Sequence, residues 1–362
     1  MSATKVLRDN IEVFDGQSLA KGWAIVSDTK IEKAGQGEYS GDTSGLEINS
    51  SAGFVSPGLI DTHIHGGGGF SADGSYQDME KVIDFHQGFG VRRTFLSLVS
   101  APLESILVAI EHASALLKSD DRFLGLHLEG PFLAQSHKGA HDPAVLHAPS
   151  DQEIEKLLDK GAGVVKSITI APELSSPKQI AMLLEADIQP CLGHTNADYE
   201  LATTHFNQGS RVLTHAFNGM NGIHHRAPGP VVAALDNKLV FSELIADGVH
   251  VRPEAAGLLD PQRVILITDA MSATGLPDGT FNLGSLAVEV VDGVARTHSG
   301  SLAGSTLTLD VAVKNFANWV GSVELAFRAA ITNPAKAYGL KQTTLAAKDR
   351  PILWSDNLQI LG

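Results

Sequence analysis

The stretch PGLIDTHIHGGGG at residues 57–69 carries the clearest structural signal in the sequence. A short apolar run ends there in His63 and His65, and a series of glycines follows. Residues two apart on a strand face the same side, so the two imidazoles share one face. Glycines lack the bulk that would keep a ligand away from the backbone. The stretch therefore predicts a strand whose end carries a pair of histidines beside an open space.

Seven further apolar runs follow this first one, and helix-like stretches separate them. The runs cover residues 59–63, 93–98, 123–128, 167–170, 188–193, 211–214, 240–245 and 263–268. The clearest helical stretches are 104–117, 151–158 and 177–185, the last beginning with a proline that suits a first helical turn. Continuous apolar strands that alternate with helices indicate a parallel sheet covered on both faces. Eight repeats favour a closed (β/α)8 TIM barrel, an α/β fold, over an open sheet. After the eighth run, residues 280–297 predict a hairpin turning at Asp292-Gly293.

The two ends of the chain predict a second, smaller unit. Residues 1–53 alternate short apolar patches with polar turns, which is typical of small antiparallel strands. This segment cannot close a core alone, and the apolar pieces at 351–354 and 358–361 are plausible additional strands. We therefore expect a small split β-sandwich domain from residues 1–53 plus 340–362, and a barrel domain over 54–339.

Composition narrows the function. The chain has 362 residues, 43% hydrophobic and 19% charged, with 27 Lys plus Arg against 41 Asp plus Glu, a net charge of −14. This composition excludes disorder and argues against nucleic acid or an anionic membrane as a partner. Cys191 is the single cysteine, which suits a reducing cytosol. Without a secretory signal or an apolar run of about 20 residues, we expect a cytoplasmic protein.

Titratable residues recur where the predicted strands end. They are His63, His65, Glu129, His194, His215 and Asp269, at the ends of the first, third, fifth, sixth and eighth runs. Chemistry in such barrels lies at the carboxyl ends of the strands. Burying these groups near one axis is costly unless they are paired or coordinate metal. The pattern predicts a metal centre, and His–carboxylate sites accept zinc, iron, manganese or cobalt.

Other histidines carry weaker signals. We expect His86, His112 and His205, in helical stretches, to face solvent. His127 lies two residues before Glu129, and both a supporting contact to the metal site and core packing fit this position.

The chain resembles the amidohydrolase superfamily and, more closely, its branch of N-acetylglucosamine-6-phosphate deacetylases. The likeness runs from about Val55 to about Pro334. It is carried by residues 57–66, 128–132, 138–141, 193–195, 215–220, 245–250, 268–270 and 302–305. The His-x-His pair and the terminal Asp specify only the superfamily, whereas Glu-Gly-Pro, His-Ala-Phe-Asn-Gly-Met and Ala-Asp-Gly-x-His together are specific to the deacetylases. The usual Gly-rich strand pair of the C-terminus is missing.

The resemblance implies a metal-dependent hydrolase that cleaves the linear amide of N-acetyl-D-glucosamine 6-phosphate in amino sugar metabolism. It implies one or two divalent metals per chain, with zinc as the first candidate. Glu129, His194 and His215 match the ligands common to the family, and His63 and His65 match a second site. Asp269 matches the catalytic acid/base and a ligand, and His141 matches a group that polarises the scissile carbonyl.

Substrate contacts and assembly are also implied by the resemblance. The matching substrate-binding positions are Ala140, Asn218, Gly219, Arg226, His250, Leu302, Ala303 and Gly304. The family forms homodimers, in which we expect the loop carrying Arg226 to reach the neighbouring site.

Two alternatives to this function stay open. One is another substrate, N-acetylgalactosamine 6-phosphate or a different amide, and the other is a non-catalytic barrel that serves in assembly. The complete ligand set argues against the second.

Overall fold

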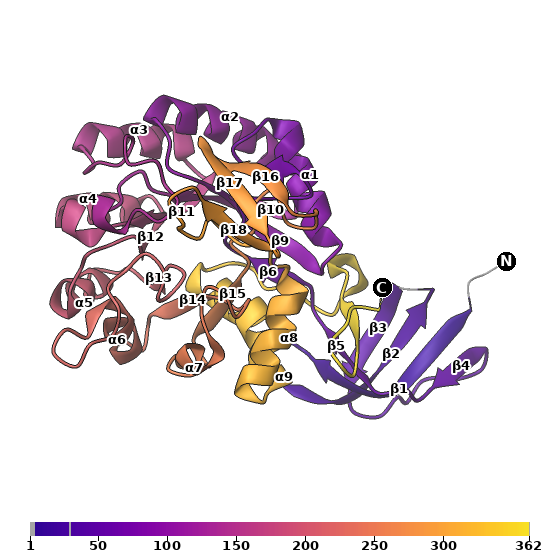
Figure 1. Cartoon of the computed structure of the whole chain (residues 1–362). Helices are drawn as coiled ribbons and strands as arrows, with labels where there is room; N and C mark the ends of the chain where they lie inside the picture. Colours follow the sequence, from indigo (N-terminus) through magenta and orange to yellow (C-terminus); the bar gives the residue numbers. More distant parts are fainter. Residues whose placement is uncertain (1–3, 29, 362) are drawn as a thin grey trace.

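A barrel of parallel strands, surrounded by helices, forms the larger part of the computed structural model, which describes residues 4–28 and 30–361 (Figure 1). The barrel strands are β6 (Leu59–Asp61), β9 (Val91–Leu98), β10 (Phe123–Glu129), β11 (Val165–Ile170), β12 (Gln189–Leu192), β13 (Val212–Leu213), β14 (Phe241–Ile245) and β15 (Val264–Ile267). They form one 8-stranded sheet in this order, and every pairing is parallel. The predicted barrel is confirmed, with one strand at each apolar run.

The first and last barrel strands meet through contacts just beyond their carboxyl ends. Thr268 donates its hydroxyl hydrogen to Oδ2 of Asp61 at 2.7 Å, and the backbone N–H of Asp269 donates to the carbonyl of His63 at 2.9 Å. Burial raises the pKa of the Asp61 carboxyl to about 7, although the hydrogen bond from Thr268 opposes this shift. This seam sets the end of the first strand beside the end of the eighth.

The helices that cover the barrel follow local sequence signals. They are α1 (Tyr76–Gln87), α2 (Leu103–Ser119), α3 (Asp151–Gly161), α4 (Pro177–Glu185), α5 (Tyr199–Asn207), α6 (Gly229–Asp236), α7 (Pro253–Ala256), α8 (Leu309–Val320), α9 (Val323–Phe327) and α10 (Asn333–Ala337). Ser75, Ser150 and Ser176 begin α1, α3 and α4 with capping boxes, which satisfy backbone N–H groups of the first turn. Within the described ranges, no helix is long and apolar enough to cross a membrane.

A 6-stranded sheet lies to one side of the barrel and draws on both ends of the chain (Figure 1). Its strands are β1 (Lys5–Phe14), β2 (Leu19–Ser27), β3 (Lys30–Gln36), β4 (Leu46–Asn49), β5 (Gly53–Ser56) and β19 (Ile352–Ser355). β19 pairs antiparallel with β5, as the apolar piece at 351–354 suggested. The domain boundaries at 53 and 340 stay a prediction, and the predicted members 1–3, 29 and 362 lie outside the described residues.

A three-stranded sheet follows the last barrel strand. It comprises β16 (Gly279–Leu283), β17 (Leu286–Val291) and β18 (Val294–Thr297). β17 and β18 join at Asp292 and Gly293, which both have positive φ, as a tight hairpin turn of this kind requires. The predicted turn is confirmed, and the predicted first arm of the hairpin is divided into two strands, β16 and β17.

The expectation that the helical histidines face solvent was wrong for His86 and His205, which are both buried. His86 occupies the last position of the buried stripe of α1, after Met79, Val82 and Ile83. Burial lowers the pKa of His86 and of His205 to about 4, so both are neutral near pH 7. Position on the helix, rather than residue type, decides which way these side chains point.

Candidate active site

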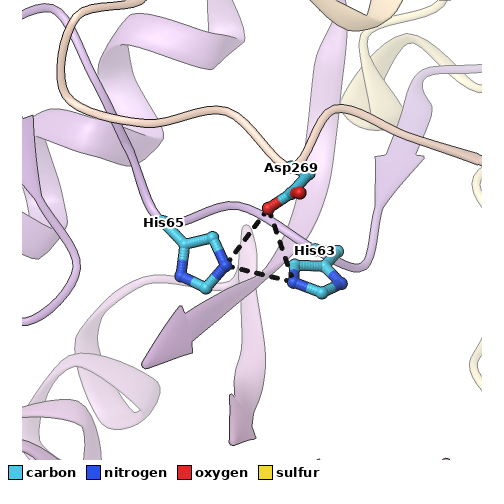
Figure 2. A group of neighbouring side chains, drawn as sticks. All are labelled: His63, His65 and Asp269. Atoms are coloured by element: carbon cyan, nitrogen blue, oxygen red, sulfur yellow. Dashed lines mark hydrogen bonds and ion pairs between the residues drawn. The ribbon is translucent and has the colours of Figure 1, made fainter. Parts of the chain in front are cut away.

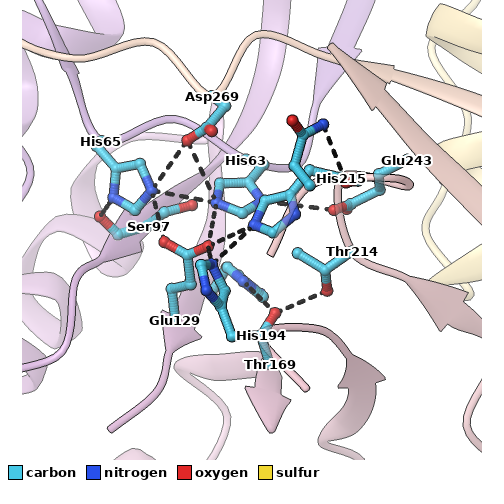
Figure 3. Close-up of polar contacts among 12 residues, drawn as sticks. His63, His65, Ser97, Glu129, Thr169, His194, Thr214, His215, Glu243 and Asp269 are labelled. Carbon is cyan, nitrogen blue, oxygen red and sulfur yellow. Dashed lines mark hydrogen bonds and ion pairs between the residues drawn. The ribbon is translucent and has the colours of Figure 1, made fainter. Parts of the chain in front are cut away.

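The titratable residues predicted at the strand ends converge in one buried cluster at the carboxyl end of the barrel (Figure 3). Glu129 lies at its centre. Its Oε1 is 3.1 Å from Nε2 of His194 and 2.8 Å from Nε2 of His215, and its Oε2 is 3.2 Å from Nε2 of His65. One carboxylate thus contacts histidines from three other strands, which is the geometry of a bridging ligand.

His63, His65 and Asp269 form a second, adjoining group that could hold a metal ion (Figure 2). Oδ1 of Asp269 lies 3.2 Å from Nε2 of His65 and 3.7 Å from Nε2 of His63. The two Nε2 atoms are themselves 3.1 Å apart. The seam between β6 and β15 holds Asp269 over the histidine pair.

The Nδ1 atoms of these rings face away from the cluster, and their contacts show why the Nε2 atoms inside it suit a cation. Nδ1 of His65 lies 3.0 Å from the carbonyl of Ser97, and Nδ1 of His194 lies 2.7 Å from the carbonyl of His137. A carbonyl only accepts hydrogen bonds, so each Nδ1 carries the hydrogen. In the neutral ring Nε2 is then a bare lone pair, and several lone pairs face one another at contact distance. Only a proton or a metal ion placed among them makes this arrangement stable, and His–carboxylate donors suit a divalent metal.

Protonation takes the place of the ion when none is bound. Burial opposes a charge on His65, but hydrogen bonds to Asp269 and Glu129 outweigh it and raise the pKa of His65 to about 9. Burial likewise opposes ionisation of Asp269, but the hydrogen bond from His65 outweighs it and lowers the pKa of that carboxyl below its usual range. Asp269 is therefore an ionised carboxylate, able to accept a proton.

His141 lies at the same carboxylate but has the opposite tautomer. The backbone N–H of Ser100 points at Nδ1 of His141 at 3.3 Å, so Nδ1 accepts and Nε2 carries the hydrogen. Nε2 lies 3.3 Å from Oε2 of Glu129. Burial lowers the pKa of His141 to about 4, which keeps the ring neutral. Although His141 lies close enough to Glu129 and His194 to be grouped with them as a ligand, this tautomer makes it a donor to an oxygen.

The backbone at the site is held in an uncommon conformation. His194, His215 and Asp269 have φ values of 44°, 25° and 50°, a region that non-glycine residues seldom adopt. Such conformations persist only where the surrounding structure enforces them, and they cluster at functional sites. Gly219 also has positive φ, and a Cβ there would lie 2.9 Å from Nδ1 of His194. The uncommon backbone conformations at His194 and His215 thus direct the two imidazoles into the cluster.

A cavity of about 240 Å³ opens over the cluster. Of the predicted substrate-binding residues, those that line it are Ala140, Asn218, Gly219, His250, Leu302 and Gly304. Ala303 is buried behind this surface, in the small core under the hairpin. Three further lining residues, Gly139, Leu283 and Ser301, were not predicted. Gly139 and Ser301 adjoin predicted positions, whereas Leu283 ends β16, within the predicted hairpin. Nδ1 of His250 lies 2.6 Å from Oδ2 of Asp247, which orients its ring.

Arg226, the remaining predicted substrate-binding residue, lies away from this cavity. It is in an exposed loop, where Nη1 donates to Nε2 of His225 at 2.9 Å, and it does not line the cavity of its own chain. None of the described residues that line the cavity is a lysine or an arginine.

A further layer of polar residues supports the cluster from inside the barrel, and sequence reasoning gave most of it no role. Oε2 of Glu243 lies 3.4 Å from Nδ1 of His63 (Figure 3). His127 contacts the hydroxyls of Ser167 at 2.8 Å and Thr169 at 3.0 Å. Its ring also packs 4.7 Å from that of His63, so it both packs and supports the site. Glu243 lies in the middle of β14 (Phe241–Ile245) rather than at the end of a strand. Only the fold therefore reveals its contact with His63.

A barrel with histidine and carboxylate ligands at its strand ends defines a class of metal-dependent hydrolases, and the chain belongs to the amidohydrolase family, whose model matches residues 54–350. The chain is 37% identical to N-acetylglucosamine-6-phosphate deacetylase of Vibrio furnissii, over 79% of this chain and 74% of that protein. It is 36% identical to N-acetylgalactosamine-6-phosphate deacetylase of Escherichia coli O157:H7, over 78% of each.

A solved structure resembles the whole chain. It is an aspartate-to-alanine mutant of N-acetyl-D-glucosamine-6-phosphate deacetylase from Mycobacterium smegmatis in complex with N-acetyl-D-glucosamine-6-phosphate. The sequences are 34% identical, the TM-score is 0.89, and the match covers 99% of this chain and 97% of that one. The small sheet and the barrel are therefore shared, and not the barrel alone.

Proposed function

We propose that this protein hydrolyses the acetamide of N-acetyl-D-glucosamine 6-phosphate, giving acetate and D-glucosamine 6-phosphate. The observation that carries the proposal is the pairing of an ionised Asp269 with a neutral, hydrogen-donating His141 across one cavity. Amide hydrolysis needs a base for the attacking water, a donor to the carbonyl oxygen and an acid for the leaving amine. The likeness to deacetylases over most of the chain supports the same reaction.

The metal has a defined place in this proposal. We assign one or two divalent ions to His63, His65, Glu129, His194, His215 and Asp269, with zinc as the first candidate and iron, manganese or cobalt as alternatives. When bound, such an ion makes water a stronger nucleophile near neutral pH and polarises a carbonyl. The Nε2 lone pairs of the histidines and the oxygens of Glu129 would hold it.

The remaining steps belong to the side chains of the chain itself. Asp269 takes a proton from the attacking water at a carboxylate oxygen and later passes it to the departing amine nitrogen. Nε2–H of His141 donates to the oxygen of the scissile carbonyl as negative charge develops there. One donor of this kind is typically worth about 3–4 kcal/mol of transition-state stabilisation. Ala140, Asn218, Gly219, His250, Leu302, Ala303 and Gly304 would surround the sugar.

The phosphate requires a cation, and no lysine or arginine is among the described residues that line the cavity. We propose a homodimer in which the exposed loop carrying Arg226 reaches the cavity of the neighbouring chain. An arginine binds phosphate through a planar fork of N–H donors, and a net charge of −14 makes such a local contact necessary. We also propose a cytoplasmic location, which suits the free buried Cys191.

One experiment tests the proposed reaction. Acetate release should be measured with N-acetylglucosamine 6-phosphate and, in parallel, with N-acetylgalactosamine 6-phosphate, on protein of known metal content. The second sugar is included because a deacetylase of that name is 36% identical to this chain. Faster turnover of the glucosamine derivative supports the proposal, faster turnover of the galactosamine derivative supports the alternative, and no release from either substrate refutes both.

A further inference from the structure

A second polar cavity lies at the opposite end of the barrel, where the strands begin. Its volume is about 100 Å³, and it lies between the barrel and the C-terminal segment 341–350. Arg92 and Arg93, near the start of β9, and Arg122, directly before β10, line it from the barrel. Lys348 and Arg350 line it from the C-terminal segment. Cationic side chains thus gather in one cavity of a chain whose net charge is −14.

Most of these cations lack a carboxylate partner. Arg122 is the exception, because it forms ion pairs with Asp84 at 2.7 Å and Asp120 at 2.6 Å. Arg92 and Arg93 donate to backbone carbonyls, and Lys348 and Arg350 make no side-chain hydrogen bond or ion pair with any described residue. Several guanidinium N–H groups and one ammonium group therefore remain as unused donors.

The unpaired charges also repel one another. Burial, together with the neighbouring charge of Arg350, lowers the pKa of Arg92 to about 10. Two acidic residues, Asp121 and Asp349, lie in the lining, but neither is within ion-pair distance of these cations in the part of the chain that the structure describes. An anion placed in the cavity would relieve the repulsion and use the free donors.

We propose that this cavity binds a phosphate group, either inorganic phosphate or the phosphate of a small ester. Guanidinium groups hold phosphate oxygens through paired N–H donors, and a lysine adds a point charge. The cavity volume suits one tetrahedral oxyanion with its substituent directed toward solvent. The site is distinct from the catalytic cavity, and it does not rest on the proposed reaction.

A purely structural role for the cluster explains only part of it. Arg92 Nε donates to the carbonyl of Arg350 at 3.1 Å, and Arg93 Nη1 donates to the carbonyl of Lys341 at 2.8 Å. These bonds fasten the C-terminal segment to the barrel. They do not involve the side chains of Lys348 and Arg350, which nevertheless face the same cavity. Those two side chains are therefore the ones to change in a test.

The test is calorimetric titration of the metal-loaded protein with inorganic phosphate and, separately, with glucose 6-phosphate. The double variant Lys348→Gln/Arg350→Gln removes two positive charges without breaking an observed side-chain contact. The double variant Lys33→Gln/Lys238→Gln removes the same charge from residues outside the cavity and is the matched control. Thermal unfolding without ligand should be the same for the three proteins.

We expect the cavity variant to bind at this site about 10- to 100-fold more weakly than wild type, and the control to bind like wild type. Asp121→Asn should do the opposite and tighten binding about fivefold, because it removes a negative charge from the cavity lining. A difference with inorganic phosphate assigns the site to the free ion, and a difference only with glucose 6-phosphate assigns it to an ester. Equal binding by wild type and the cavity variant overturns the proposal, since any remaining signal then comes from the catalytic cavity.

Discussion

His63 and Glu243 face each other inside the barrel, with Nδ1 and Oε2 3.4 Å apart and both side chains buried. The other oxygen of Glu243 accepts the hydroxyl hydrogen of Tyr338 at 2.9 Å. A carboxylate behind a histidine ligand fixes the orientation and tautomer of the ring. We therefore expect Glu243 to act on the proposed metal site through His63, without contacting substrate.

Replacing Glu243 with Gln should weaken ion binding at His63 and His65 by about 10- to 100-fold, because the ring loses its charged partner. A competition titration against a metal chelator measures this affinity. Tyr338→Phe is the matched control, since it leaves Oε2 facing His63 and should have the smaller effect. Equal affinities for wild type and Glu243→Gln would remove the residue from this role.

The number of ions bound per chain tests whether His63 and His65 hold a second metal beside the one assigned to Glu129, His194 and His215. Elemental analysis of fully metal-loaded protein should exceed one equivalent per chain, and His63→Ala should reduce the value to one. The reason is that Glu129, His194 and His215 remain intact in the variant. If both proteins hold a single equivalent, the histidine pair at the end of β6 is not a ligand site.

Asp269→Asn preserves the shape of the side chain and removes its ability to take up a proton. We expect kcat to fall by several orders of magnitude, while metal held by Glu129, His194 and His215 and the affinity for substrate are largely kept. Steady-state kinetics with a parallel metal assay checks this. Retention of more than about a tenth of the activity would falsify the assignment of Asp269 as the base.

Arg226→Ala should raise KM for the 6-phosphate about 10- to 200-fold, because a charge-assisted contact is worth about 1.5–3 kcal/mol. The slow reaction with unphosphorylated N-acetylglucosamine should hardly change. Arg252, exposed and paired with Glu254, offers a control arginine for the same substitution. Mixing Arg226→Ala with Asp269→Asn protein should restore one competent site in a mixed dimer. If subunits are shown to exchange and activity does not return, Arg226 does not act across the interface.

His205 gives a prediction about stability and pH. Its pKa falls from about 6.5 in the unfolded chain to about 4 in the fold because it is buried. As pH drops through this window the unfolded state takes up a proton that the folded state refuses, so stability declines. Between pH 7 and pH 5 the loss is about 2 kcal/mol. Urea unfolding of wild type and His205→Leu at both pH values checks this, and the variant should lose less stability by that amount. Identical pH dependence would show that His205 is not the group responsible.

Local patterns predicted the regular parts of the fold well. Each apolar run became a barrel strand, and α4 covers residues 177–185 as its proline and apolar spacing indicated. Periodicity succeeds here because strand and helix register are set by neighbouring residues. β16 was not predicted as a separate strand, because the predicted hairpin has residues 280–291 as one arm, and a turn at Gly284 and Ser285 divides that arm into β16 and β17.

The part of the candidate site that could be predicted consists of residues at the carboxyl ends of strands, because the barrel topology brings those ends together. Glu243, Ser97 and the tautomer of His141 were not, because they depend on which groups from distant strands meet across the interior. The same limit applies to His86, whose burial follows from the orientation of α1. The position of Arg226 outside its own cavity was expected only from the resemblance.

The pairing of β5 with β19, which are far apart in the sequence, has a consequence for protein synthesis. Trp354 of β19 donates its indole N–H to the hydroxyl of Ser56, a contact spanning 298 residues. At about 5–20 residues per second, a ribosome takes roughly 15–60 s to supply that partner. Throughout this interval β5 presents an unpaired, apolar edge, which is a site where nascent chains pair wrongly with one another. β19 therefore protects an edge of a sheet whose first strands are made long before it, and until β19 emerges that edge stays open to other chains unless a chaperone covers it.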